Sequence, residues 1–422
     1  MLSKRSLKRN QVLIPKLLDN HGALLYGDTS VIDLSTAENK LLMKELLLSD
    51  LNNSLSTFSW SSHDLAYSEG VGGCPRVRGL IADLANAHFN PRLKVNKSHI
   101  VLGAGGCFAL NALIGEICDP GDGILIAAPY WPGLDLSISV HNDAVPVIVQ
   151  IPFADFFGIR SINYYEAALA TAAIPVKGLI ICNPHNPLGR NYPQETLQAT
   201  LDFCAEASIH LISDEVYALS QHAKPTTSNS VANFVSALSL DTTHAKGLVH
   251  VLYSLSKDFG CNGVRLGAFI SQENRDVVMS GALSTHCQTS TMATIVAQKI
   301  ILKESNIEYV NTRGRELLTS AYSMVATFMQ ERGVEHVPAE SGMYVFARLC
   351  PVPSREAEQL FRSILKKNAM VISAGTDYHL EIPGWFRVCY ACDREKLEKG
   401  LERISVCIDE FRRTHVGQTK LG

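Results

Sequence analysis

Apolar, β-rich runs alternate with helical stretches from about residue 97 to 270, and this alternation constrains the fold more than any other feature. The apolar runs include "HIVLGAG", "DGILIAAP", "GLIICNP", "IHLISDE" and "LVHVLYSLS", and stretches such as "ETLQATLDFCAEA" separate them. Apolar strands separated by helices form a mostly parallel sheet that helices cover on both faces. We therefore expect an α/β fold with a large, mostly parallel sheet of the seven-stranded type.

The remainder of the chain predicts a second, smaller α+β unit. Residues 305–333 have the pattern of a long amphipathic helix. After it come the strand-like "GMYVFARL", a helix near 354–368, the strand-like "GWFRVCYA" and a final helix at 393–413. The first 50 residues show no sheet of their own, and we expect them to pack onto this unit.

The length of the chain, 422 residues, is too great for one simple core. We expect an N-terminal arm that forms part of the small domain, a large cofactor-binding domain, and a linking helix with the small C-terminal domain. These three parts correspond to residues 1–50, 51–300 and 301–422.

Composition excludes several classes of protein. The formal net charge of −3 gives no basic surface for nucleic acid. The sequence contains no run of about 18 apolar residues, so we expect no membrane span. The basic start "MLSKRSLKRN" is not followed by the apolar segment of a secretory signal. Eleven cysteines, an odd number, indicate free thiols in a reducing compartment. We expect a cytoplasmic protein, with a mitochondrial presequence as the alternative, and no metal site.

Two turns at strand ends could hold a ligand. "LGAGGCF" at 102–108 places glycines between a strand and a helix, where backbone N–H groups can bind phosphate; the alternative is a turn needed only for packing. "NPHNPLGR" at 183–190 forms a rigid loop at a strand's carboxyl end, and the alternative is an ordinary Asn-Pro turn. Asp214, in "ISDEVYALS", is either a helix N-cap or an acid held in a site.

The stretch "YSLSKDFGCNGVRLG" at 253–267 decides between these alternatives. It combines Ser254, Lys257 and Arg265 with three glycines directly after an apolar strand. Lysine can form an imine, and the fork of an arginine suits phosphate. The stretch therefore predicts a Schiff-base cofactor that carries a phosphate.

One arginine, Arg387, lies among apolar neighbours in "GWFRVCYA". A charged side chain is almost never buried without a partner. We therefore expect Arg387 to meet an anion.

Taken in order, "NPHNPLG", "SDEVY" and "SLSKDFGCNGVRLG" resemble the fold type I pyridoxal-phosphate enzymes of the class I/II aminotransferase family. Within that family, "STAENKLL" at 35–42 and "PGWFRVCYA" at 383–391 are similar to the 1-aminocyclopropane-1-carboxylate synthase branch. The similarity covers roughly residues 30–410. It implies pyridoxal 5'-phosphate as cofactor, an α-amino acid as substrate and a homodimer.

The resemblance also assigns roles to the residues nearest the cofactor ring. Lys257 would form the imine with the cofactor, and Asp214 would pair with the ring nitrogen. Tyr217 and Asn186 would bind the ring oxygen. Lys257, Asp214 and Tyr217 are the predicted catalytic residues.

A second set of residues would hold the cofactor's phosphate. Ser254, Arg265 and the backbone amides around Gly106 and Cys107 match the family's phosphate-binding positions. Tyr67, in "AYSEGVGG", matches the tyrosine that reaches the phosphate in the partner subunit.

The remaining matches concern the cofactor face and the substrate. Tyr130 and Trp131, in "APYWPG", match an aromatic pair in which one ring lies on the cofactor, and the sequence does not decide which. Arg387 matches the arginine that binds the substrate α-carboxylate. Glu38, in "TAENK", is a candidate substrate-binding residue that favours the synthase-like branch; the alternative is a surface residue of the arm.

The reaction itself stays open between several outcomes of one carbanion at the substrate Cα. Cleavage of a C–S bond is the preferred hypothesis, either ring closure on S-adenosylmethionine or lysis of a cysteine S-conjugate, as in fungal secondary metabolism. Transamination is the runner-up, and a non-catalytic cofactor-binding protein is a remote alternative.

Overall fold

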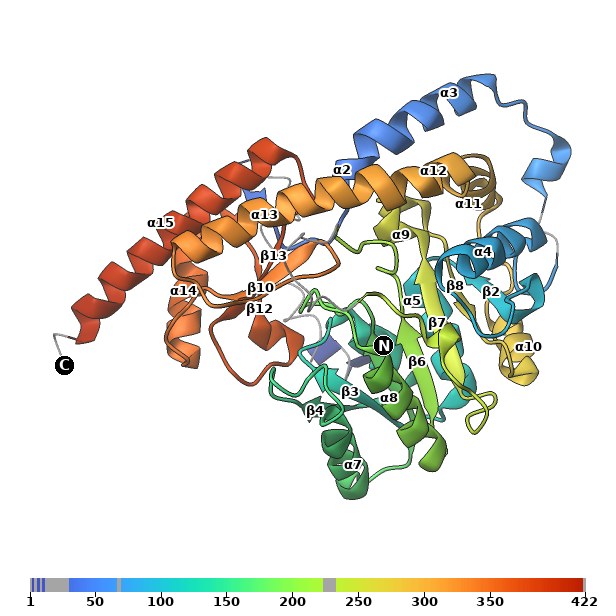
Figure 1. The fold of residues 1–422 in the computed structure, drawn as a ribbon, viewed down its shortest axis with the longest axis horizontal. Helices are drawn as coiled ribbons and strands as arrows, with labels where there is room; N and C mark the ends of the chain where they lie inside the picture. The colour runs from blue at the N-terminus through green and yellow to red at the C-terminus, as the bar shows by residue number, and fades with distance from the viewer. Residues whose placement is uncertain are drawn as a thin grey trace.

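A seven-stranded sheet forms the centre of the larger part of the molecule, seen in a computed structural model (Figure 1). The structure describes residues 30–66, 70–222 and 233–419, together with residues 2, 3, 6, 7, 10 and 11. The strand order is β2-β8-β7-β6-β5-β3-β4; β8 runs antiparallel to both of its neighbours, β2 and β7, and the pairs from β7 to β4 are parallel. The strands are β2 (Ile100–Gly103), β3 (Gly123–Ala128), β4 (Val145–Gln150), β5 (Val176–Cys182), β6 (His210–Asp214), β7 (Val249–Ser254) and β8 (Gly267–Ile270).

Helices cover both faces of this sheet, because alternate side chains of each strand point to opposite sides. On β3, Ile124 packs into the core that contains Leu113 of α5, whereas Leu125 packs into the core that contains Leu201 of α8. The main helices of this part are α4 (Pro75–His88), α5 (Gly106–Ile117), α7 (Ser161–Thr171), α8 (Gln194–Glu206), α10 (Arg275–Ser284) and α11 (Thr291–Val296). Short helices are α2 (Lys40–Leu42), α3 (Ser49–Thr57), α6 (Gly133–Asp135) and α9 (Leu255–Asp258). The expected α/β fold with a mostly parallel sheet is confirmed.

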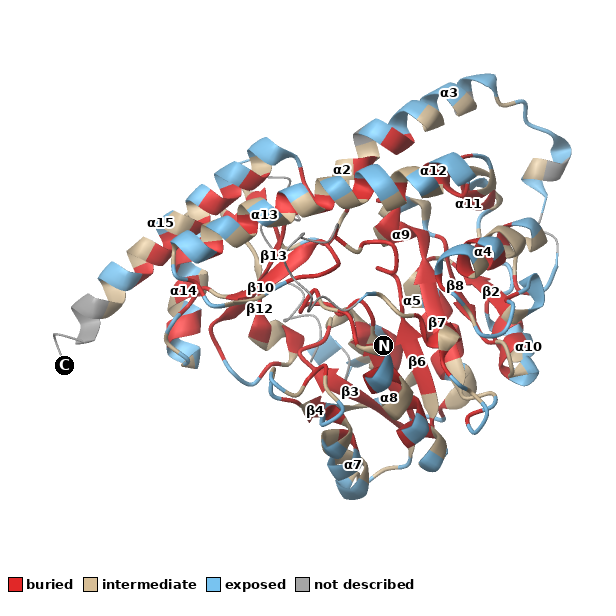
Figure 2. Ribbon diagram, in the orientation of Figure 1, coloured by how far each residue is buried: buried red, intermediate tan, exposed pale blue. Residues whose placement is uncertain are grey.

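A separate four-stranded antiparallel sheet forms the smaller domain, in the order β12-β13-β10-β9. Its strands are β9 (His336–Val337), β10 (Tyr344–Arg348), β12 (Ser373–Ala374) and β13 (Trp385–Cys389). Helices α14 (Arg355–Lys367) and α15 (Arg394–Thr419) pack beside it, and they carry buried stripes and exposed stripes along their length (Figure 2). The predicted α+β unit is therefore present.

Two expectations for the ends of this unit need adjustment. The helix predicted over 305–333 is built from α12 (Glu304–Tyr309), a π-helical turn and α13 (Arg315–Glu331). In the described part of the N-terminal segment, Ile32 and Leu34 pack into the core that contains Phe386 of the small domain, whereas Leu46 and Leu47 pack into the core that contains Leu125 of the large sheet. The segment also contributes a short strand, β1 (Ile32–Asp33), which pairs in parallel with β11 (Met370–Val371). Two residues of strand are too few to give a period-2 pattern in the sequence.

The parallel register brings the functional loops to one edge of the large sheet. Cys182 at the end of β5 is paired with Asp214 at the end of β6, and Asp214 is paired with Leu252 near the end of β7. The loops that follow these strands therefore meet at the carboxyl edge, where open α/β sheets bind ligands. Within the described part of the chain, no helix is both long and apolar enough to cross a bilayer.

Candidate active site

A cavity of about 1070 Å³ opens at this edge, between the large sheet and the small domain. Its described lining combines residues of the N-terminal segment, the strand-end loops of the large sheet and the small domain. They include Ser35, Ala37, Gly106, Cys107, Trp131, Asn186, Asp214, Tyr217, Ser254, Ser256, Lys257, Arg265, Tyr378 and Arg387. Residues as far apart in the sequence as Ser35 and Arg387, which are separated by 352 positions, thus meet around one space.

Lys257 enters the cavity from α9, the short helix that directly follows β7. The hydroxyl of Ser254 accepts the Ser256 N–H and so caps this helix. The Lys257 Nζ atom donates to the carbonyl oxygen of Ala37 at 2.7 Å. Burial lowers the pKa of Lys257, and the nearby positive charge of Arg387 lowers it further. The amine is therefore more easily deprotonated than an exposed lysine.

Asp214 occupies the last position of β6 and faces the same cavity. Burial raises the pKa of its carboxyl to about 7, although the Val216 N–H at 3.4 Å and the charge of Lys257 act in the opposite direction. A cationic group placed beside Asp214 would favour its ionised form. The carboxyl is thus suited to pair with a positively charged ring nitrogen.

The turn after β2 and the loop after α9 together form a cradle beside the N-terminus of α5. Helix α5 begins at Gly106, preceded by Gly105 at φ +91°. Arg265, itself at φ +59°, lies over this turn: its Nη2 donates to the Ala104 carbonyl at 3.3 Å and its Nη1 to the Asn262 carbonyl at 2.7 Å. A Cβ atom on Gly105 would come within 2.2 Å of Arg265 Nη2. The loop therefore needs glycine at this position for the arginine to sit there.

Hydroxyl and thiol groups complete the cradle. Ser254 donates to the Leu266 carbonyl at 3.1 Å, and its hydroxyl lies 3.0 Å from that of Ser256. Cys107 lies in the first turn of α5, and burial, followed by the charge of Asp214, raises the pKa of its thiol. The thiol is therefore held neutral beside the helix N-terminus.

Arg387 lies at the centre of β13 and is almost fully buried. Its Nη1 donates to the side-chain oxygen of Asn186 at 2.8 Å, and its Nη2 donates to the carbonyl of Ser35. The rings of Tyr344 and Tyr378 lie 5.2 Å and 5.1 Å from its guanidinium carbon. No described residue forms a hydrogen bond with the buried Nε. The expectation that this cation meets an anion is consistent with an incompletely satisfied guanidinium facing the cavity.

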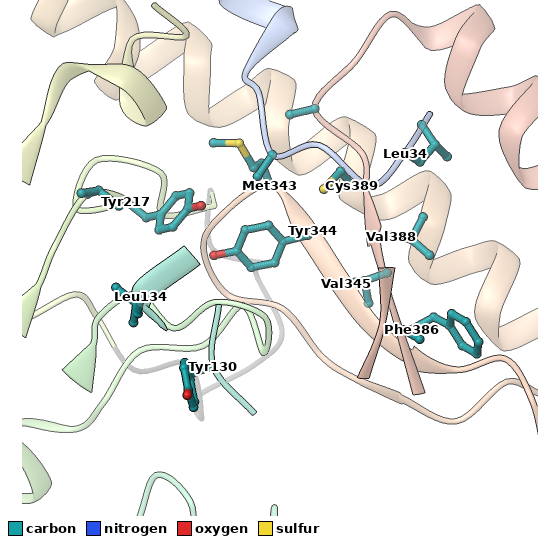
Figure 3. Packing of buried hydrophobic residues seen from close by; sticks show 14 of the residues in the cluster. Leu34, Tyr130, Leu134, Tyr217, Met343, Tyr344, Val345, Phe386, Val388 and Cys389 are labelled. Carbon is teal, nitrogen blue, oxygen red and sulfur yellow. The ribbon is translucent and has the colours of Figure 1, made fainter. Parts of the chain in front are cut away.

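The aromatic residues fall into two groups. Tyr217 lines the cavity and packs edge-on against Tyr344, with ring centroids 5.5 Å apart (Figure 3). Trp131 also lines the cavity, whereas Tyr130 does not. Tyr130 lies behind the wall, where its hydroxyl donates to Asp135 at 2.6 Å. The structure therefore leaves Trp131, and not Tyr130, as the ring of this pair that faces the cavity.

Two predicted residues are not in the described wall. Glu38 does not line the cavity, because its carboxylate turns to Lys40 at 3.2 Å. Its charge still acts on Lys257, where it opposes the lowering of the pKa by burial. Tyr67 lies outside the described residues.

The sequence did not reveal several parts of the wall. Tyr378 lies against Arg387 although no motif surrounds it. The backbone carbonyls of Ser35 and Ala37 accept hydrogen bonds from Arg387 and Lys257, respectively. Backbone acceptors carry no sequence signal. The cluster "STAENK" was the only indication that this segment reaches the site.

A family model, "Aminotransferase class I and II", matches residues 29–404. The chain belongs to this family. It is 69% identical to the "Probable aminotransferase tcpI" of Claviceps purpurea over 415 residues, which cover 98% of this chain and 97% of that protein. It is 40% identical to the "Probable aminotransferase sirI" of Leptosphaeria maculans, over 97% of this chain and 99% of that one.

More distant similarity extends to the synthases. This chain is 30% identical to "1-aminocyclopropane-1-carboxylate synthase 6" of Arabidopsis thaliana, over 89% of this chain and 78% of that protein. A double mutant of the Thermus thermophilus aspartate aminotransferase superposes with a TM-score of 0.77 at 21% identity, covering 96% of this chain and 99% of that chain. At that identity the superposition supports the fold alone.

Members of this family are pyridoxal-phosphate enzymes, and the residues present fit that cofactor. The cradle beside Arg265 offers an arginine, a helix N-terminus and hydroxyl groups that would hold a phosphate. Lys257 would supply the amine for the cofactor's aldehyde, and Asp214 would supply the carboxylate for its ring nitrogen. The protein is therefore a pyridoxal-phosphate-dependent enzyme of the aminotransferase family.

Proposed function

We propose that this enzyme cleaves the C–S bond of a cysteine S-conjugate, an amino acid whose sulfur carries a bulky group. When bound, pyridoxal phosphate withdraws electrons from the substrate Cα. The Cα–H and Cβ–S bonds break, and the thiolate leaves with the electron pair of the C–S bond and takes up a proton. Water then hydrolyses the remaining enamine. The overall change is S-conjugate plus water to thiol, pyruvate and ammonia.

The chain's own residues divide the work between proton transfer and binding. Lys257 accepts the proton from the substrate Cα, and its lowered pKa makes the neutral amine available for this step. Arg387 binds the α-carboxylate, and Asn186 orients the guanidinium through its 2.8 Å hydrogen bond. The binding energy of a charge-assisted arginine–carboxylate pair fixes the Cα–H bond toward the lysine.

The remaining residues hold the cofactor in place. Arg265, Ser254 and the N-terminus of α5 bind its phosphate. Asp214 would pair with its ring nitrogen, and Tyr217 would donate to its ring oxygen. Trp131 supplies the aromatic wall. These groups come from different loops of a rigid sheet, so the cofactor is held at several points.

The observation that carries the proposal is the size and charge of the cavity. Its volume, about 1070 Å³, is at the upper end for small-molecule sites. Apolar side chains contribute to its lining, among them Val31, Leu365, Met370, Val371 and Ile372. This wall suits a substrate with a large, mostly apolar side chain.

The charges of the lining distinguish between the two sulfur substrates. The described lining contains five cations, Lys257, Arg265, Arg362, Lys366 and Arg387, and two carboxylates, Asp214 and Asp377. Asp214 faces the cofactor, and Asp377 already pairs with Arg362 at 2.8 Å. A sulfonium cation such as S-adenosylmethionine would find no free carboxylate among these residues. A neutral thioether conjugate avoids this repulsion.

Transamination is the second candidate, favoured by the names of the probable aminotransferases at 69% and 40% identity. Transamination would require the same large cavity to bind a keto acid as second substrate in every catalytic cycle, and this requirement is the argument against it. The two reactions differ in what they require. Elimination continues without a second substrate, whereas transamination stops after one turnover unless a keto acid is present.

The test is to incubate the purified holoenzyme with S-benzyl-L-cysteine, S-methyl-L-cysteine and S-adenosylmethionine, without keto acid. We expect benzyl thiol and pyruvate in equal amounts over many turnovers, with less product from the smaller conjugate. Turnover of these amino acids only when a keto acid is added, without thiol release, would replace the lyase by the aminotransferase. Formation of the cyclopropane amino acid from S-adenosylmethionine would instead favour the synthase.

We also propose a homodimer with sites at the subunit interface, an arrangement in which Tyr67 would reach the partner's phosphate. Mixing Tyr67→Phe protomers with Lys257→Ala protomers should create some sites that are intact in both positions. Activity should therefore exceed that of either variant alone. A fully active monomer in sedimentation would contradict this arrangement.

A further inference from the structure

Tyr130, Asp135 and His379 form a hydrogen-bonded cluster just behind the cavity wall. The hydroxyl of Tyr130 donates to Asp135 Oδ1 at 2.6 Å, and His379 Nε2 lies 2.8 Å from Asp135 Oδ2. The rings of Tyr130 and His379 are stacked, with centroids 4.5 Å apart and an interplanar angle of 15°. Both oxygens of one carboxylate are therefore engaged by a pair of stacked rings.

The cluster joins the two sheets of the molecule. Tyr130 and Asp135 lie after β3 of the large sheet, whereas His379 lies between β12 and β13 of the small one. Two further hydrogen bonds run in parallel: the Tyr130 N–H donates to the Tyr378 carbonyl at 3.0 Å, and the Gln150 side chain donates to the His379 carbonyl at 2.9 Å. These contacts fix one loop of the large sheet against one loop of the small domain.

Each loop carries a wall of the cavity immediately beside the cluster. Trp131 follows Tyr130, and Tyr378 precedes His379. The Tyr378 ring lies 5.1 Å from the guanidinium carbon of Arg387. His379 adopts φ +63°, a conformation that costs energy for a non-glycine residue and persists only where surrounding contacts enforce it.

We propose that Tyr130, Asp135 and His379 are positioning residues that set the separation between the Trp131 wall and the Tyr378–Arg387 wall, and thereby the affinity for the amino-acid substrate. The inference rests on the proposed role of Arg387 as the carboxylate-binding residue. None of the three touches the cavity, so they act through their neighbours. A displacement of either wall would weaken contacts that bind the substrate equally in the ground state and the transition state, which raises KM and leaves kcat nearly unchanged.

The test uses His379→Gly, because glycine adopts φ +63° without strain and the variant should fold. With S-benzyl-L-cysteine as the probe, we expect KM to rise about tenfold while kcat stays within about twofold. The visible circular dichroism of the bound cofactor, which reports the asymmetry around it, should weaken. His379→Gln keeps a donor near the position of Nε2 and should recover most of both signals.

Ser208→Gly is the matched control, since Ser208 has φ +55° on an exposed turn after α8, and it should leave both signals unchanged. Unchanged KM and circular dichroism in His379→Gly would overturn the proposal. So would a His379→Gln variant as impaired as the glycine variant, because the hydrogen bond would then not matter.

Arg387→Lys distinguishes failure of the positioning inference from failure of the proposed role of Arg387. If Arg387→Lys raises KM and His379→Gly does not, only the positioning inference fails. If neither raises KM, the role of Arg387 fails as well.

Discussion

Asn186 accepts a hydrogen bond from Arg387 at 2.8 Å, and this contact joins a loop of the large sheet to a strand of the small one. Asn186 lies in the loop after β5 of the large sheet, and Arg387 lies in β13 of the small one. Because Nε of the guanidinium has no partner in the part of the chain that the structure describes, the described hydrogen bonds of Arg387 satisfy it only partly. A substrate carboxylate that binds here would therefore connect to both domains at once.

Arg387→Lys should raise the KM for the amino-acid substrate sharply while cofactor binding stays nearly unchanged. Lysine replaces a planar fork by a point charge, and losing one partner of a buried charged pair costs about 2–5 kcal/mol. That cost corresponds to a fall in kcat/KM of about 30-fold or more. Steady-state kinetics and cofactor absorbance measure the two effects separately. Arg348→Lys, on the neighbouring strand and paired with Glu335, is the control. Equal activity on the decarboxylated amine would rule out the role of Arg387.

The rate at which the apoprotein takes up pyridoxal phosphate should depend on pH through Lys257. Only the neutral amine condenses with an aldehyde, and burial together with the charge of Arg387 lowers the pKa of this lysine. Removing that charge in Arg387→Gln should raise the pKa, so the rise of the rate with pH should move to higher pH. Stopped-flow absorbance over a pH series measures this directly. A shift to lower pH would contradict the electrostatic relation between the two residues.

Gly105→Ala should weaken cofactor binding. The added Cβ would meet Arg265 Nη2 at 2.2 Å, and φ +91° is unfavourable for alanine. Arg265 would be displaced from the cradle, so we expect the dissociation constant of pyridoxal phosphate to rise at least about tenfold, a change of about 1.4 kcal/mol. Gly79→Ala in α4 has open space around the new Cβ and should leave the affinity unchanged. Equal affinity in both variants would mean that the cradle does not bind phosphate.

Asp258→Asn should gain stability relative to the unmodified protein as the pH rises from about 4 to about 8. Burial raises the pKa of Asp258 to about 8 from an ordinary value of 3.8, although hydrogen bonds from the Leu219 N–H and the Tyr253 hydroxyl act against it. Over this range the unfolded chain releases a proton that the folded chain retains, so the free energy of unfolding falls as pH rises. Asparagine cannot ionise and removes this loss.

Thermal unfolding at pH 4, 6 and 8 measures the effect. The melting temperature of Asp258→Asn, relative to the unmodified protein, should increase steadily along the series. Asp83→Asn, on an exposed position of α4, should show a constant difference. A difference for Asp258→Asn that shrinks toward pH 8 would show that burial does not control this carboxyl.

Local patterns in the sequence predicted the larger features of the fold and the cofactor. Buried parallel strands read as apolar runs because both faces of the sheet are covered, and residues 253–267 place Ser254 and Lys257 on one strand–helix turn and Arg265 in the loop that follows it. Such short-range groupings survive as motifs because their geometry depends on a few consecutive residues. The proposed roles that the motifs suggest for Asp214 and Asn186 agree with their positions in the cavity.

Long-range contacts, in contrast, could be decided only by the tertiary structure. The sequence left Tyr130 and Trp131 equivalent, and the turn at Asp135 decides that Trp131 faces the cavity while Tyr130 packs against His379. Glu38 forms an ion pair with Lys40, while the carbonyl of its neighbour Ala37 accepts a hydrogen bond from Lys257. Such partners lie up to 249 positions apart, as Tyr130 and His379 do, and their pairing is fixed by how two sheets pack rather than by any local pattern. The sequence by itself determined which chemical groups this protein has, and the packing of the two domains determined which of them meet.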